Sequence, residues 1–238
     1  MFGGFGTIAL LNSAGNISIW EVLALWMLAF LIGGIPFGFL IGKFNGIDVR
    51  HQGSGNIGAT NVFRVVGKGW GLLVLILDFL KAFLPLSLYR YHVSELAGMP
   101  VDVDLFLLIS GVLSVFGHNY SPYLGFKGGK GMATSAGFLA GLIPWSLLVC
   151  FSAWLGVFLS TRYVSLASII ASIALPVGTW IFYPSQPWLL AAALFLGTMG
   201  VWRHRSNIRK LRAGTEHRFG KPRADTPATP GTSEGTNP

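Results

Sequence analysis

Polar segments that could hold phosphate interrupt a strongly apolar chain, and the first of them is a loop rich in glycine. It runs from Gly53 to Arg64 and contains three glycines among serine, threonine and asparagine. Glycine lets backbone N–H groups approach an anion closely, and hydroxyls and amides add hydrogen bonds. The loop lacks the Gly-Lys-Ser/Thr ending of a Walker motif and follows no predicted strand, which excludes both common nucleotide-binding motifs. It is either a phosphate site or a flexible polar connection.

A second segment, Gly125 to Gly131, places Lys127 and Lys130 among four glycines. The next helix is expected to begin at about Gly131, so its N-terminus adds a partial positive charge. Point charges, exposed N–H groups and a helix N-terminus together suit a phosphate group. Anchoring at a membrane surface explains the lysines but leaves the glycines unexplained.

Further polar residues lie in or beside apolar runs. His204 and Asn207 are three residues apart, so they share a face if that segment is helical. Asp78 and Lys81 lie within an apolar run, where ionisable side chains usually face a cavity or each other. This pair is either a structural ion pair or a route for Lys81 to reach an anion. Ser165 is expected at the inner edge of a later run.

The elements that must position these residues are membrane helices. The chain has 238 residues, of which 52% are hydrophobic and only 11% charged, whereas soluble domains carry about 25% charged residues. A net charge of +8 would also suit a protein that binds nucleic acid. Nucleic-acid binding is disfavoured here because the aromatic residues lie inside the apolar runs and not among the basic ones.

Six apolar runs are long enough to consider as spans, and about 20 apolar residues cross a bilayer. Lysine and arginine gather on the cytoplasmic side of membrane proteins. Six spans would leave the basic C-terminal segment outside, so the run from 132 to 160 is expected to cross twice, with a turn at Pro144-Trp145. We therefore predict an all-α polytopic membrane protein of about seven helices, with the N-terminus outside and the C-terminus cytoplasmic. The runs are 19–42, 69–89, 105–123, 132–160, 166–183 and 188–202.

Three regions are expected along the chain. Residues 1–16 form an N-terminal extension on the outer side, and residues 17–212 form the membrane domain. Residues 213–238 are rich in Gly, Thr and Pro and are predicted to be a disordered cytoplasmic tail.

Five ordered motifs resemble the bacterial PlsY family of acyl-phosphate-dependent glycerol-3-phosphate acyltransferases. The resemblance covers about Ile32 to Glu216, and the motifs read GSGNIGATNVFRVVGKGWG, LDFLKAF, GHNYSPYLGFKGGKGMATSAG, RYVSLAS and RHRSNIRKL. The resemblance implies seven helices in the bacterial cytoplasmic membrane, with an active site that faces the cytoplasm. It implies acyl phosphate and glycerol 3-phosphate as substrates and membrane lipid as surroundings, with no cofactor, metal or nucleic acid.

The resemblance also assigns roles to individual positions. Catalytic roles fall on Ser54, Arg64, Lys127, His204 and Asn207, and a structural role falls on Glu216. Binding of substrate phosphate falls on Gly53, Asn56, Thr60, Asn61, Lys81, His118, Gly128, Gly129, Lys130 and Ser165.

An acyl phosphate is already activated, so direct transfer to a hydroxyl needs no covalent acyl-enzyme. No histidine is followed five residues later by aspartate, which excludes the H-x-x-x-x-D acyltransferases. The general base stays open between His118, His204 and a phosphate oxygen of a substrate. A phosphate or organic-anion transporter is the alternative function, but it should show an internal repeat and polar residues that continue to the outer side. A purely structural membrane protein would leave the glycines unexplained.

Overall fold

The computed structural model describes residues 17–91 and 99–220, and these residues form ten α-helices and one short 3-10 helix. The predicted extension 1–16 lies outside the described residues, as does the tail from 221 onward. The helices are α1 (Ile19–Gly34), α2 (Phe37–Phe44), α3 (Ala59–Val65), α4 (Lys68–Tyr91), α5 (Val103–Asn119), η1 (Pro122–Leu124), α6 (Met132–Leu142), α7 (Pro144–Thr161), α8 (Val164–Phe182), α9 (Pro187–Arg203) and α10 (Arg205–Arg212).

Local sequence signals explain where several helices begin. Ser18 and Glu21 form a reciprocal capping box at the start of α1, and the side chain of Asp102 caps α5. Pro144 and Pro187 occupy the first positions of α7 and α9, where a missing backbone N–H costs nothing. The predicted break in the run from 132 to 160 is therefore confirmed, since α6 ends at Leu142 and α7 begins at Pro144.

Two features of the fold differ from the expected runs. The first run is not continuous, because the backbone leaves the helix at Ile35 and Pro36 before α2 begins. The loop after it contains a short helix, α3, which carries Arg64. The periodicity of apolar residues signals neither change.

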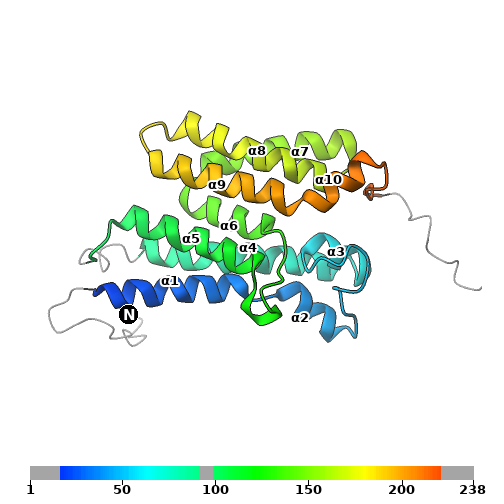
Figure 1. Cartoon of the computed structure of the whole chain (residues 1–238), viewed down its shortest axis with the longest axis horizontal. Coiled ribbons are helices and arrows are strands. Elements are labelled where there is room, and N and C mark those ends of the chain that lie inside the picture. The colour runs from blue at the N-terminus through cyan, green and yellow to red at the C-terminus, as the bar shows by residue number, and fades with distance from the viewer. Residues whose placement is uncertain (1–16, 92–98, 221–238) are drawn as a thin grey trace, which may run out of the picture.

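The long helices form two groups (Figure 1). Helices α1, α4 and α5 pack together, and α7, α8 and α9 form the second group, with α6 between them. The short helices α2, α3 and α10 lie at the same end of the molecule. Close approach of α1 and α5 depends on glycine, because a Cβ at Gly33 would overlap the backbone of Ser114. Small residues at such contacts are typical of membrane helices.

The fold is that of an all-helical integral membrane protein, as predicted. Within the described residues, five helical segments are long and apolar enough to span a bilayer, and α6 is apolar but shorter. With 11 residues, α6 extends only about 16 Å, well short of the hydrocarbon core. Large apolar side chains on the outer surface remain exposed, as lipid-facing residues do. They include Trp20, Leu88, Trp180 and Trp188.

Candidate active site

A cavity of about 1430 Å³ is lined by residues of both helix groups. Its polar lining comes from α3 and the preceding loop, the start of α6, and the chain from the end of α9 onward. Its apolar lining comes from the long helices, with Leu75 and Phe79 on α4, Leu147 on α7 and Leu175 on α8. One space therefore joins a polar end to an apolar arm.

Two asparagines shape the glycine-rich loop before α3. Asn61 is buried, its side-chain oxygen accepts from the backbone N–H of Ser54 at 2.8 Å, and its amide nitrogen donates to two loop carbonyls. The side-chain oxygen of Asn56 accepts from the backbone N–H of Gly58 at 2.8 Å. Gly53 has φ of +62° and lies against Asn61, so a side chain there would be both strained and obstructed. These contacts hold the loop in place, while Thr60 and Arg64 extend the same lining along α3.

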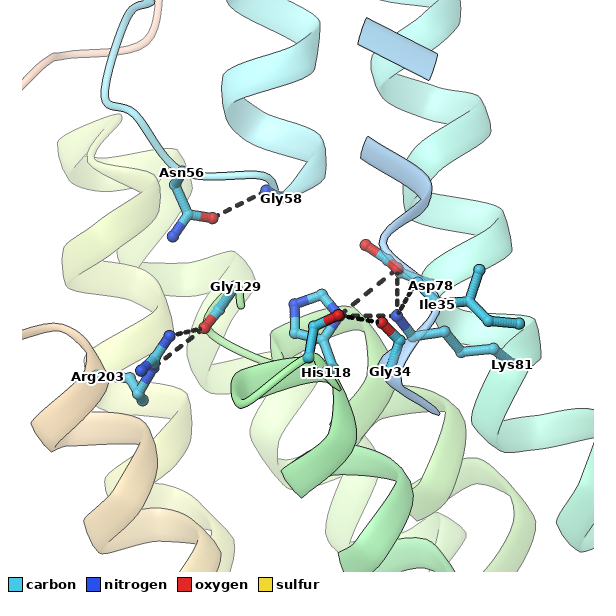
Figure 2. A network of polar contacts seen from close by, with 10 residues as sticks. Gly34, Ile35, Asn56, Gly58, Asp78, Lys81, His118, Gly129 and Arg203 are labelled. Atoms are coloured by element: carbon cyan, nitrogen blue, oxygen red, sulfur yellow. Dashed lines mark hydrogen bonds and ion pairs between the residues drawn. The ribbon is translucent and has the colours of Figure 1, made fainter. Parts of the chain in front are cut away.

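The second glycine segment is fixed by hydrogen bonds to the backbone N–H and C=O groups of Gly128 and Gly129. The N–H groups of Gly128 and Gly129 donate to the carbonyls of Asn119 and His118 at 3.2 and 3.0 Å. The guanidinium of Arg203 donates to the carbonyls of both glycines, and its contact with Gly129 is visible in Figure 2. Because these N–H groups already have partners, the two glycines serve to bring the loop close to α5. Any phosphate contact from this segment must come from its neighbours.

Those neighbours are Lys130 and the first turn of α6. Lys130, Gly131, Met132 and Ala133 line the cavity, and no side chain caps the helix at Gly131. Unsatisfied N–H groups and the helix dipole make such an N-terminus attractive to an anion. The pKa of Lys130 is lowered from 10.5 to about 8, mainly by burial and to a lesser extent by nearby cations, while Glu216 acts to raise it. A partly buried ammonium among cations binds a phosphate strongly, because the phosphate supplies the missing counter-charge.

A chain of hydrogen bonds connects Lys130 to the end of the described chain. Lys130 donates to the side-chain oxygen of Asn207, whose amide nitrogen donates to Glu216 at 2.8 Å. The same oxygen of Glu216 accepts from the hydroxyl of Ser165 at 2.8 Å. Glu216 thereby fixes the orientation of the Asn207 amide and directs its oxygen at Lys130.

The chain after α10 closes the polar end of the cavity. Residues 214–219 line it, although they were expected to belong to the tail. The ring of Phe219 contacts Phe63 on α3 and Phe158 on α7, and its N–H donates to the carbonyl of Arg162 at 2.8 Å. The folded domain therefore continues at least to Phe219.

The two histidines of the site have different surroundings. His204 is 2% exposed, and its Nδ1 lies 2.8 Å from the carbonyl of Gly200. A carbonyl can only accept, so Nδ1 carries the proton and Nε2 keeps its lone pair. Burial lowers the pKa of His204 to about 4, with a further contribution from Lys130. His118 instead contacts Lys81 through Nδ1 at 2.9 Å.

Comparison with known proteins identifies the family. Residues 23–214 match the family described as glycerol-3-phosphate acyltransferase. A glycerol-3-phosphate acyltransferase of Aquifex aeolicus is 44% identical over 201 residues, which cover 84% of this chain and 100% of that protein. The chain belongs to the PlsY family of glycerol-3-phosphate acyltransferases. It is an acyltransferase of phospholipid synthesis, and the family resemblance seen in its motifs is confirmed.

Other members and solved structures of the family agree. The protein of Hyphomonas neptunium is 42% identical over 211 residues, covering 87% of this chain and 98% of its own length. A crystal structure of PlsY (YgiH) in its glycerol 3-phosphate form is similar with a TM-score of 0.74 and 44% identity, covering 84% of this chain and 96% of that one. The lysophosphatidic acid form of PlsY gives a TM-score of 0.72 at 43% identity.

Most of the acyltransferase residues expected from the motifs meet at the polar end of the cavity. The lining includes Gly53, Ser54, Asn56, Thr60, Asn61, Arg64, His118, Lys130, Ser165, His204, Asn207 and Glu216. Their individual roles remain predictions. The structure gives Asn56 and Asn61 loop-shaping contacts and gives Ser165 a contact to Glu216, in addition to any contact with substrate.

Four expected residues lie outside the lining. Lys127 is exposed in the loop before α6, and Gly128 and Gly129 lie behind the cavity wall with their N–H groups engaged. Lys81 is buried, and its ammonium is surrounded by three acceptors. For Lys81 the structure therefore favours the ion pair over direct contact with an anion.

Two site residues were not selected from the sequence. Arg203 donates hydrogen bonds to the carbonyls of the glycine segment. In the sequence it lies in a basic segment directly after an apolar run, where anchoring at the membrane surface already explains an arginine. Asn119 is fully buried and lines the cavity, and its side-chain oxygen has no hydrogen-bond partner among the described residues. The signal in the sequence is that Asn119 directly follows His118 in the motif GHNYSPYLGFKGGKGMATSAG. The part of the chain that the structure describes contains no group of three side chains suited to a metal ion.

Proposed function

We propose that this acyltransferase moves a fatty acyl group from acyl phosphate directly to the 1-hydroxyl of glycerol 3-phosphate, giving lysophosphatidic acid and phosphate. The observation that carries the proposal is the union of a cationic, N–H-rich end with an apolar arm in one cavity. A substrate that pairs phosphate with a hydrocarbon chain matches both parts. The related PlsY structures, described in glycerol 3-phosphate and lysophosphatidic acid forms, agree with an acceptor and product of this kind.

The phosphate groups of the two substrates repel each other, so the site must supply positive charge to hold them together. Arg64 suits bidentate contact with a phosphate, and Lys130 and the α6 N-terminus supply further positive charge. Holding the acceptor hydroxyl against the activated carbonyl removes much of the entropic barrier. The same cations stabilise charge on the departing phosphate.

Direct transfer is supported by the surroundings of the candidate nucleophiles. The Ser165 hydroxyl donates a hydrogen bond to Glu216, a carboxylate that also holds Asn207 in place, and Cys150 belongs to the apolar lining on α7. His204 is neutral with a lone pair on Nε2, which makes it a candidate proton acceptor. A phosphate oxygen of the bound substrates is the alternative base.

The proposed setting is the bacterial cytoplasmic membrane, with the N-terminus outside and the polar end of the cavity at the cytoplasmic face. The support is the basic character of α10 and of the segments beside α2 and α3, which lie at one end of the fold (Figure 1). Both substrates then reach the site from suitable phases, the acyl chain from lipid and glycerol 3-phosphate from water.

The test uses purified protein in lipid with acyl phosphate and labelled glycerol 3-phosphate. Labelled lysophosphatidic acid and free phosphate should form in equal amounts, and no product should form from acyl thioesters. In the absence of glycerol 3-phosphate, a labelled acyl donor should leave no acyl group on the denatured protein. Lys130→Ala should abolish most turnover, while Lys68→Ala, an exposed charge on α4, should not. Failure to form lysophosphatidic acid would refute the proposal, and a stable acyl-enzyme would refute direct transfer.

A further inference from the structure

The ammonium of Lys81 lies in a buried pocket of acceptors outside the cavity lining. It donates to Asp78 at 2.8 Å on the same helix and to the carbonyl of Ile35 at 2.9 Å. That carbonyl is available because the chain leaves the helix at Ile35, before Pro36. Both acceptors lack any hydrogen to give, so Lys81 must be the donor in each of these contacts.

The third partner of Lys81 is Nδ1 of His118, 2.9 Å away (Figure 2). An ammonium has no lone pair, so this contact is a hydrogen bond only if Nδ1 accepts. A proton on Nδ1 would bring two donors together inside a buried site, and a neutral lysine beside Asp78 would forfeit the ion pair. The contact with Lys81 therefore requires that Nδ1 of His118 carry no proton.

We propose that Asp78 and Lys81 are positioning residues that hold His118 as the neutral Nε2–H tautomer, so that it donates a hydrogen bond in the acyl-transfer site and does not act as the base. This inference rests on the proposed function for the identity of the acceptor, which is a phosphate or acyl oxygen of substrate. The tautomer itself does not depend on the reaction.

The charges that face His118 come from two helices. Asp78 and Lys81 belong to α4, with the carboxylate 3.6 Å from Nδ1, and Arg203 approaches from α9. Two cations and one anion surround the ring, which opposes a further positive charge on it. Figure 2 shows Nδ1 turned toward Lys81 and the opposite ring nitrogen turned away, on the side of Gly129.

The packing of Gly129 fixes the other side of the ring. A Cβ at Gly129 would overlap Nε2 of His118, so glycine is required for the imidazole to stay in this position. His118 lines the cavity, and its remaining donor is Nε2–H. The other histidine, His204, has the opposite tautomer, with its proton on Nδ1 and its lone pair on Nε2. The site thus pairs a donor imidazole with an acceptor imidazole.

The decisive measurement is nitrogen NMR of protein labelled at its histidines and purified in lipid. The resonances of His118 are assigned by their absence from His118→Gln. We expect a protonated Nε2 and an unprotonated Nδ1 that stay unchanged between about pH 6 and 9, the range where an ordinary histidine titrates. A protonated Nδ1, or a charged ring at neutral pH, would overturn the inference. Lysophosphatidic acid formation is assayed separately, so loss of the proposed function and loss of the tautomer are distinct outcomes.

Variants test the origin and the use of the tautomer. The double variant Asp78→Asn with Lys81→Met removes the donor to Nδ1 without leaving an unpaired charge, and the Nδ1–H form should then appear. Lys68→Met removes an exposed charge from the same helix and should leave the His118 signals unchanged. No change in the double variant would exclude Lys81 as the cause.

Activity separates a donor from a base. Glutamine can place an N–H where Nε2–H lies but cannot take up a proton. His118→Ala should lose about a hundredfold or more in kcat, as removal of a positioned donor commonly does, whereas His118→Gln should stay within about tenfold of the parent. Equal losses in both variants would refute donation. The NMR result for the parent protein decides the tautomer even if a variant fails to fold.

Discussion

The titration of Lys130 gives a prediction whose size follows from the structure. Its pKa is lowered to about 8, first by burial and then by neighbouring cations. Raising the pH from about 7 to 9 reduces the ammonium fraction from about nine tenths to about one tenth. Glycerol 3-phosphate is already about nine tenths dianionic at pH 7, since its second pKa is about 6, so its own titration contributes little over this range. We therefore expect kcat/KM for glycerol 3-phosphate to fall about tenfold.

The stability of the protein should change in the opposite direction. The pKa of Lys130 is lower in the folded state than the ordinary value of 10.5, so the unfolded chain binds more protons between pH 8 and 10.5. Folding is therefore penalised by about 3 kcal/mol below pH 8, and this penalty is relieved as the pH rises. Loss of activity with retained or increased thermal stability separates titration from alkaline unfolding.

The assay measures labelled lysophosphatidic acid at low glycerol 3-phosphate across this pH range. Lys130→Arg keeps its charge throughout, so its profile should stay flat even if its overall rate is lower. Lys68→Arg is the matched control and should follow the parent profile. A parallel fall in the parent and Lys130→Arg would refute the assignment of this titration to Lys130.

Three further predictions concern other parts of the site. Because its pKa is lowered to about 4, His204 stays neutral above about pH 5. Above that pH, the pH–rate profile should therefore show no inflection that His204→Gln removes. An inflection near pH 6.5 that disappears in this variant would contradict the prediction. Glu216→Ala removes the acceptor of the hydrogen bonds from Ser165 and Asn207, which costs about 1–3 kcal/mol. We expect kcat/KM to fall between about fivefold and a hundredfold, and Glu216→Gln to be less affected. Equal effects of the two substitutions would argue against Glu216 as the acceptor that positions Asn207. Gly129→Ala should lower the melting temperature because its Cβ overlaps His118, whereas Gly69→Ala, whose Cβ meets open space, should not; equal melting temperatures would refute the packing argument.

Much of the fold could be predicted because hydrophobic length is a local property. The apolar runs correspond to α1, α4, α5, α8 and α9, and Pro144 marks the predicted break between α6 and α7. The break at Ile35 and Pro36 was not predicted, although proline signals it, because the surrounding run is apolar on both sides. The short helix α3 was missed because its polar residues look like those of a loop.

Sequence by itself determined the class of the protein, its family and the set of polar segments that meet at one end. Charge, hydrophobic length and motif order are written in the chain and need no knowledge of contacts. Only the tertiary structure decided what each polar group does, because a hydrogen-bonding role depends on which partner is within reach. The N–H groups of Gly128 and Gly129, for example, bond to backbone carbonyls and not to a phosphate, and the ammonium of Lys81 contacts the imidazole of His118. The glycine segment that first indicated a phosphate site is, in the folded protein, the means by which Lys130, His118 and the N-terminus of α6 are brought to the cavity.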